Sequence, residues 1–157
     1  MNNSYALVTG GTSGIGLEIS KDLAKRGFNI MLVARTKEKL EKTSRKLESK
    51  YSIKCDFYAS DLTLINSPDE IYRYTSQKKY NIDILINNAG YALPNAFHEN
   101  SMEDEEKCLR VLGTSVIALT KKYIKDMISN GGGKIMIVSS VAAFAPASSL
   151  QSLYGPV

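Results

Sequence analysis

Short, nearly uncharged apolar runs alternate along the chain with longer segments in which apolar residues recur every three or four positions. The short runs are typical of strands covered on both faces of a parallel sheet, and the longer segments are typical of amphipathic helices. The runs predict strands at Tyr5–Val8, Asn29–Ala34, Lys54–Ala59, Ile82–Ile86 and Lys134–Ser139. The periodic segments predict helices at Gly14–Arg26, Lys37–Tyr51, Ser67–Lys79 and Ser101–Ser129.

Residues at the helix ends support these bounds. Gly27 follows the first helix, at the position where a left-handed residue commonly ends a helix. Ser67 is expected to cap the third helix and Pro68 to lie in its first turn. The fourth helix opens with acidic residues at 103–106, which the helix dipole favours. Its expected core-facing stripe comprises Leu109, Leu112, Val116, Leu119, Tyr123 and Met127.

A glycine-rich segment joins the first strand to the first helix. Gly10, Gly14 and Gly16 follow the spacing G-x-x-x-G-x-G. Such a turn lets the backbone approach a pyrophosphate, whose charge lies at the positive end of the following helix. No Gly-Lys-Ser/Thr follows, which argues against a nucleoside triphosphatase. The turn alone leaves flavodoxin-like proteins and S-adenosylmethionine-dependent methyltransferases open.

The alternation of strands and helices predicts an α/β fold. Right-handed crossovers would place helices on both faces of a parallel sheet. With the glycine turn after the first strand, we expect a Rossmann-like doubly wound parallel sheet with strand order 3-2-1-4-5. No linker, repeat or low-complexity segment interrupts the pattern, so residues 1–157 are expected to form a single domain.

Charge and hydropathy narrow the class of protein further. The net charge is +4, but lysines alternate with acidic residues, as at 37–42, which indicates solvated helix faces and no nucleic-acid partner. No apolar run approaches the ~18 residues of a membrane span, and no signal peptide is visible. We therefore expect a cytoplasmic protein.

The metal-binding residue types are sparse. Cys55 and Cys108 lie far apart without metal-ligand spacing, which indicates free thiols in a reducing compartment. His98 is the sole histidine. We therefore expect no metal site and no Ser-His-Asp triad.

The residue after the second predicted strand bears on cofactor choice. Sites specific for NAD usually place an acidic residue there, against the ribose 2′-hydroxyl. This sequence has Arg35 instead, and a guanidinium can pair with a 2′-phosphate in fork geometry. The residue therefore favours NADPH over NADH. The alternative is a surface arginine that opens a helix.

Several further motifs occur along the chain together with the glycine turn. They are Thr9-Gly10-x-x-x-Gly14-x-Gly16, Asp61-Leu62, Asn87-Asn88-Ala89-Gly90, and Ser140 with Tyr154. Together they resemble the short-chain dehydrogenase/reductase family over the whole chain. The resemblance implies that the pyrophosphate lies against Gly10, Thr12, Ser13, Gly14, Ile15 and Gly16.

The same resemblance assigns the other cofactor contacts. It implies that the Asp61 side chain accepts a hydrogen bond from the adenine amino group, with the Leu62 backbone nearby. It places Asn87 and Ala89 beside the central ribose. Asp61 could instead cap a turn, and adjacent asparagines at a strand end could be turn chemistry or brace the sheet.

The resemblance also implies the catalytic residues. Ser140 would bind the substrate carbonyl, and Tyr154 would be the general acid in reduction and the general base in oxidation. A lysine four residues after the tyrosine would assist it by lowering its pKa, but the sequence given stops at Val157. The later strands, the helix that carries this lysine and the substrate-covering loop are therefore expected to be missing from this chain.

Two further positions depart from the family pattern. Leu112 stands where a helix asparagine would help to hold a proton-relay water, a contact that leucine cannot make. Tyr154 follows Ser140 by one position more than is usual in the family, which weakens the choice of Ser140 over Ser139.

These residues predict an NADP(H)-dependent oxidoreductase that reduces a carbonyl or oxidises a secondary alcohol. Apolar residues around the site favour an apolar small-molecule substrate. The resemblance implies a homodimer or homotetramer for a full-length protein. The alternative is a non-catalytic dinucleotide-binding or interaction module, which becomes the stronger hypothesis if the protein ends at Val157.

Overall fold

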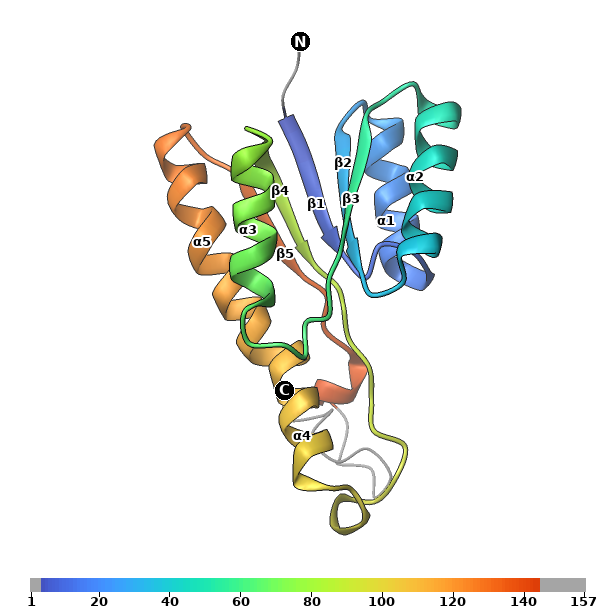
Figure 1. The fold of residues 1–157 in the computed structure, drawn as a ribbon, viewed down its shortest axis with the longest axis vertical. Coiled ribbons are helices and arrows are strands. Elements are labelled where there is room, and N and C mark those ends of the chain that lie inside the picture. The colour runs from blue at the N-terminus through green and yellow to red at the C-terminus, as the bar shows by residue number, and fades with distance from the viewer. Residues whose placement is uncertain (1–3, 145–157) are drawn as a thin grey trace.

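The computed structural model describes residues 4–144, and these form one parallel sheet with helices on both faces (Figure 1). The strand order is β3-β2-β1-β4-β5, and every neighbouring pair is parallel. The strands are β1 (Ser4–Thr9), β2 (Asn29–Ala34), β3 (Cys55–Ala59), β4 (Asn81–Asn87) and β5 (Lys134–Ile137). The predicted fold class and strand order are therefore confirmed.

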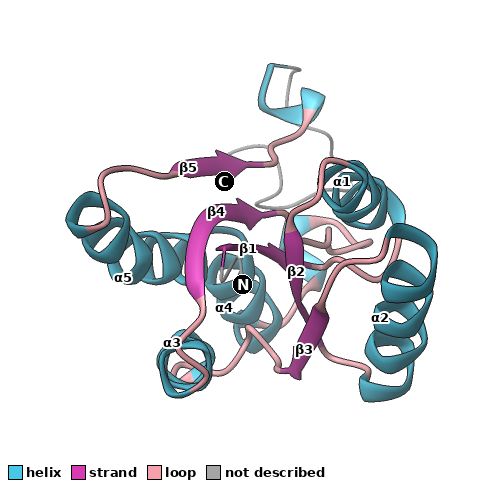
Figure 2. Cartoon of the chain, turned by 90° about the horizontal axis from the view of Figure 1, so that it is seen from above, coloured by secondary structure: helices cyan, strands magenta, loops and turns pink. Residues whose placement is uncertain are grey.

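The helices divide between the two faces of the sheet (Figure 2). One face carries α1 (Gly14–Lys25) and α2 (Lys37–Tyr51), and the other carries α3 (Ser67–Gln77) and α5 (Ser115–Ser129). Helix α4 (Met102–Leu109) extends beyond the carboxyl ends of the strands. The shorter helical segments are η1 (Phe97–Glu99), η2 (Arg110–Thr114) and η3 (Val141–Phe144).

The helices on both faces of the sheet explain why the central strands are mainly apolar. Successive residues of a strand point to opposite sides of the sheet. Leu7 of β1 packs in the same buried cluster as Ile71 of α3, whereas Val8 packs in the cluster that contains Leu40 of α2. Because both faces are covered, both positions of the alternation carry mainly apolar side chains.

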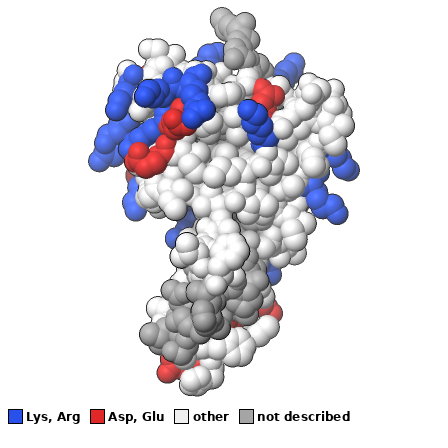
Figure 3. Space-filling view, turned by 180° about the vertical axis from the view of Figure 1, so that it is seen from behind, with Lys and Arg blue, Asp and Glu red and all other residues white. Residues whose placement is uncertain are grey.

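The edge strand β5 is less covered. It pairs only with β4 among the described residues, and its Met136 and Ile137 side chains remain exposed. The middle of the face seen from behind, toward which β5 lies, carries few charged side chains (Figure 3). Lys and Arg on that view gather mainly to one side, interleaved with Asp and Glu, as the sequence pattern predicted for solvated helix faces.

The helix predicted at 101–129 contains a π-helical turn, η2, between α4 and α5. This wider turn shifts the buried side of the helix. The buried residues here are Glu105, Cys108, Val111, Ser115, Leu119, Tyr123 and Met127. The predicted stripe was therefore wrong in its first half: Leu109 is exposed, and Leu112 and Val116 are only half-buried.

The start of α3 also differs from the prediction. Asn66 occupies the N-cap position, and Pro68 lies in the first turn as expected. The Ser67 hydroxyl instead hydrogen-bonds to the Ser60 hydroxyl, just after β3, so it ties the helix start to the sheet. Within residues 4–144, no helix combines the length and apolar character required to cross a membrane.

Candidate functional site

A cleft of about 480 Å³ lies at the carboxyl ends of the strands. Loops that follow β1, β2, β3, β4 and β5 all contribute to its wall, as parallel strands whose ends meet at one edge allow. Its lining includes the predicted site residues Gly10, Thr12, Ser13, Ile15, Arg35, Asp61, Leu62, Asn87, Ala89 and Ser140. Gly14 and Gly16 belong to the same turn but do not line the cleft, and Tyr154 lies outside the described residues.

The glycine turn packs directly against the loop after β4. A Cβ atom on Gly16 would lie 2.4 Å from Asn88 Nδ2 and 2.5 Å from the Gly10 carbonyl oxygen. Gly10 itself has a φ of +67°, a conformation that L side chains rarely adopt. The turn therefore requires glycine for close approach at one position and for backbone conformation at the other.

Thr9 and Asn88 fix this contact through hydrogen bonds. The backbone amides of Asn88 and Ala89 both donate to Thr9 Oγ1 at 3.0 Å, and that hydroxyl donates to the Ile86 carbonyl at 3.3 Å. Asn88 Nδ2 in turn donates to the Thr9 carbonyl at 3.0 Å. The sequence motif contained both residues but gave no reason for this link, which holds the turn and the β4 loop in a single unit.

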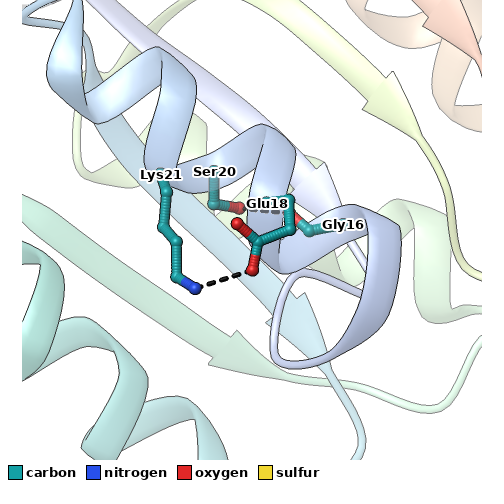
Figure 4. A network of polar contacts seen from close by, with 4 residues as sticks. All are labelled: Gly16, Glu18, Ser20 and Lys21. Atoms are coloured by element: carbon teal, nitrogen blue, oxygen red, sulfur yellow. Dashed lines mark hydrogen bonds and ion pairs between the residues drawn. The ribbon is translucent and has the colours of Figure 1, made fainter.

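The amino end of α1 faces the cleft with unused donors. Ser13 is the N-cap residue, no side chain among residues 4–144 caps the helix there, and its first turn has no acidic residue. Figure 4 shows the first acidic side chain of α1, Glu18, paired with Lys21 at 2.7 Å, while Ser20 donates to the Gly16 carbonyl at 2.8 Å. The positive end of the helix dipole is therefore available to an anion.

Asn87 presents an unsatisfied acceptor in the cleft wall. It is only 3% exposed, and its Nδ2 donates to Thr120 Oγ1 at 3.2 Å. Its Oδ1 has no hydrogen-bond partner among the described residues. A buried acceptor without a donor is costly, so this atom fits a ligand that brings a hydroxyl or amide donor. The ribose of a dinucleotide carries such hydroxyls, and the residues present therefore fit that cofactor.

Asp61 caps a turn and also lines the cleft. Its Oδ1 accepts from the Thr63 backbone amide at 2.9 Å, which is the turn-capping contact. The residue also lines the cleft, beside the buried Leu62. The turn thus orients the carboxylate at the cleft wall.

The carboxyl end of β2 supplies the basic part of the wall. Arg35 is exposed and lines the cleft together with Thr36 and Lys39. Sequence reasoning missed Lys39. The signal that could have found it is its position in the first turn of the helix that begins just after Arg35, at the same carboxyl end of β2.

An apolar surface forms the other part of the wall. Val111, Leu112 and Val116 line it from η2 and α5. Leu112 Cδ2 would lie 2.9 Å from a Cβ atom on Gly90, so the leucine packs closely on the loop after β4. It fills a position where the family pattern has a polar side chain.

The catalytic serine predicted from the motif also lines the cleft. Both Ser139 and Ser140 line the cleft, so its wall does not separate the two candidates. The Ser140 hydroxyl accepts a hydrogen bond from the Ala142 amide at 3.2 Å and keeps its own proton available for donation. In the described part of the chain, no group of three metal-ligating side chains comes together.

Comparison with known proteins agrees with this geometry. The sequence model of the short chain dehydrogenase family matches residues 4–155, and the chain belongs to that family. It is similar to a fatty acyl-CoA reductase of Acinetobacter baylyi, with 33% identity over 149 residues that cover 94% of this chain and 50% of that protein. It is also similar to a very-long-chain 3-oxoacyl-CoA reductase of Bos taurus, with 33% identity over 90% of this chain and 46% of that protein.

Solved structures share the fold. L-sorbose reductase from Gluconobacter frateurii, complexed with NADPH and L-sorbose, superimposes with a TM-score of 0.91 at 29% identity, over 97% of this chain and 57% of that one. A short-chain dehydrogenase from Sphingobium yanoikuyae in complex with NADPH gives 0.90 at 29% identity, over 98% and 59% of the two chains. The chain thus spans about half the length of the curated relatives it matches.

Proposed function

We propose that this chain provides the cofactor half of an NADP(H)-dependent oxidoreductase that reduces a carbonyl or oxidises a secondary alcohol. The observation that carries the proposal is the cleft itself. It brings together the amino end of α1, which no side chain of residues 4–144 caps, Asn87 Oδ1, which has no partner among those residues, and the cationic Arg35. These groups suit the pyrophosphate, a ribose and a 2′-phosphate, in that order.

The preference for NADP(H) depends on Arg35. Its guanidinium can donate two parallel hydrogen bonds to a phosphate, and no carboxylate takes its place at the end of β2 to repel that charge. The NADPH complexes of two similar structures support this choice, since both share the fold at 29% identity.

When bound, the nicotinamide supplies or accepts a hydride. For reduction, the Ser140 hydroxyl would donate to the substrate carbonyl oxygen and orient it. Tyr154 would transfer its phenolic proton to that oxygen as negative charge develops there, and would take the proton back in oxidation. Because an ordinary tyrosine has a pKa of about 10, this exchange near neutral pH requires a group that lowers it.

We also propose an apolar substrate. Val111, Leu112 and Val116 line the same cleft as Ser140, so a substrate that contacts them would lose water from its apolar surface. The names of the relatives include an acyl-CoA reductase, a sugar reductase and a putative steroid dehydrogenase, so they support a carbonyl or alcohol substrate without selecting one chemical class.

Titration with NADPH and, separately, with NADH tests the cofactor assignment, with nicotinamide fluorescence as the signal. The wild-type chain should bind NADPH more tightly. Arg35→Asp should weaken NADPH and relatively favour NADH, whereas Lys42→Asp, an equal charge change farther along α2, should leave the preference intact. An unchanged preference in Arg35→Asp would contradict the assignment.

Turnover tests the catalytic assignment and needs the longer protein that contains this chain. Tyr154→Phe should abolish NADPH oxidation with a panel of apolar ketones while it leaves NADPH affinity nearly unchanged. Residual activity close to the wild-type level would rule out Tyr154 as the acid. Tight NADPH binding with no turnover by the wild type would favour the non-catalytic dinucleotide-binding module.

A further inference from the structure

Two cationic side chains, those of Arg35 and Lys39, line the same cleft. Arg35 follows β2 directly, and Lys39 lies in the first turn of α2. The two residues flank Thr36, which is the N-cap residue of α2. Leu40 is fully buried and anchors this turn against the sheet. The backbone therefore holds both cations at one place in the cleft.

Neither cation has a carboxylate partner among residues 4–144. The ion pairs in that part of the chain use the cations Lys21, Arg26, Arg45, Lys107 and Lys122. Asp61 is the acidic residue in the cleft wall, and its Oδ1 already accepts from the Thr63 amide. Like charges that line one cleft repel each other, and an anion bound by both Arg35 and Lys39 would remove that repulsion.

A phosphate monoester matches this arrangement. It carries close to two negative charges at neutral pH, since its second pKa is about 6, whereas each phosphate of a dinucleotide pyrophosphate carries one. A guanidinium binds two of its oxygens in a planar fork, and an ammonium neutralises the remaining charge as a point donor. The hydroxyl of Thr36, also in the cleft wall, adds a neutral donor.

Resting on the proposed NADP(H) function, we infer that Lys39 is a specificity-determining residue that binds the 2′-phosphate together with Arg35. Lys39 adds affinity for a cofactor that carries this monoester and adds none for NADH. Its contribution is smaller than that of Arg35, because an exposed ammonium makes one contact where the guanidinium makes two.

The test compares Lys39→Gln with Lys42→Gln, which removes the same charge from α2 at a position that does not line the cleft. Affinities for NADPH and NADH are measured by nicotinamide fluorescence, and affinities for adenosine 2′,5′-diphosphate and 5′-AMP by calorimetry. Lys39→Gln should weaken NADPH and the 2′,5′-diphosphate by about fivefold to tenfold and leave NADH and 5′-AMP unchanged. Lys42→Gln should change none of these four affinities.

The combination with Arg35→Gln provides a second criterion. If both cations hold one phosphate, the double variant should lose less NADPH affinity than the product of the two single losses. The inference is overturned if Lys39→Gln matches Lys42→Gln while Arg35→Gln still weakens NADPH, an outcome that leaves the proposed function standing. It is also overturned if Lys39→Gln weakens NADPH and NADH equally. Equal affinity of the wild type for NADPH and NADH would overturn the NADP(H) preference itself, and the inference with it.

Discussion

At the amino ends of the strands, Asp56 Oδ2 accepts hydrogen bonds from the hydroxyls of Tyr74 and Tyr80, each at 2.8 Å. At the carboxyl ends of the same sheet, Asn87 Oδ1 has no partner among the described residues, and Arg35 forms no ion pair with any of them. Polar groups at the amino end are thus satisfied by one another. Those at the carboxyl end are held in position and left for a ligand.

The aromatic rings at the amino end strengthen the contrast. Tyr5 of β1 stacks on Tyr80 with ring centroids 4.1 Å apart, and Tyr58 of β3 lies 4.9 Å from Tyr74. These contacts join β1, β3, α3 and the start of β4 around one carboxylate. We therefore expect substitutions at the amino end to change stability alone, and substitutions at the carboxyl end to change cofactor binding.

The largest effect is expected at the glycine turn. Gly16→Ala places a methyl group within 2.4 Å of Asn88 Nδ2 and 2.5 Å of the Gly10 oxygen, so backbone must move. We expect a loss of about 3 kcal/mol in the free energy of unfolding, measured by urea denaturation, and at least a tenfold (~1.4 kcal/mol) loss of NADPH affinity.

Gly27→Ala is the matched control for that substitution. Gly27 also has a positive φ, of +87°, but no atom lies within 4 Å of its Cβ position. It should cost about 1 kcal/mol through backbone strain and leave NADPH affinity unchanged. A Gly16→Ala protein that binds NADPH as the wild type does would contradict the close packing of turn and loop.

A smaller loss, confined to stability, is expected at the amino end. Asp56→Asn removes the charge that accepts from both tyrosines and should lower the free energy of unfolding by about 2 kcal/mol. NADPH affinity should not change. Asp69→Asn, which breaks only an exposed ion pair with Lys122, should cost less than about 0.5 kcal/mol. A change in cofactor affinity with Asp56→Asn would show that the two ends are not independent.

The pH dependence of stability sharpens this test. Burial, together with the hydrogen bond to Asp56 and its negative charge, raises the pKa of Tyr74 and of Tyr80. The pKa values of both tyrosines are higher in the folded chain than in the unfolded chain. Their contribution to the free energy of unfolding is therefore complete below pH ~10 and is lost as the pH rises above it. Unfolding free energies measured from about pH 8 to 11 should fall more steeply for the wild type than for Asp56→Asn. Parallel curves would mean that the carboxylate does not set these pKa values.

The smallest effect is expected in thiol labelling. Burial raises the pKa of Cys55 to about 12 and also raises the pKa of Cys108, so both should react slowly with a disulfide reagent at pH 7.5. Cys108 lies below the loop after β4, where its thiol donates to the Tyr91 carbonyl at 3.7 Å. The reagent should label Cys108 faster than Cys55, and bound NADPH should slow the labelling of Cys108 alone. If NADPH slowed the labelling of both cysteines equally, both thiols would be exposed through the same global unfolding.

The sequence predicted the sheet well because continuous apolar runs have few alternatives to buried parallel strands. The bounds of β2 and α2 matched the prediction, and the others shifted by one or two residues. The π-helical turn at Arg110–Thr114 was missed because a change from four-residue to five-residue hydrogen bonding leaves no mark in apolar spacing until the following turns are compared. The buried residues of this helix therefore differed from the expected stripe.

The sequence predicted some parts of the site and missed others. The glycine turn and Asp61 belong to local motifs, so their place at the cleft followed from the sequence. The contacts between Thr9 and Asn88 join residues 79 positions apart, and the spacing of residues along the sequence does not indicate them. Ser67 was expected to cap its own helix, but a tertiary contact with Ser60 took its hydroxyl.

Hydrogen–deuterium exchange of the chain with and without NADPH tests most directly whether the carboxyl end binds the cofactor while the amino end only stabilises the fold. We predict that NADPH slows exchange in residues 10–16, 35–39, 60–63 and 87–91, and leaves 55–57 and 80–83 unchanged. Protection at the amino end, or no protection at the glycine turn under saturating NADPH, would contradict the account.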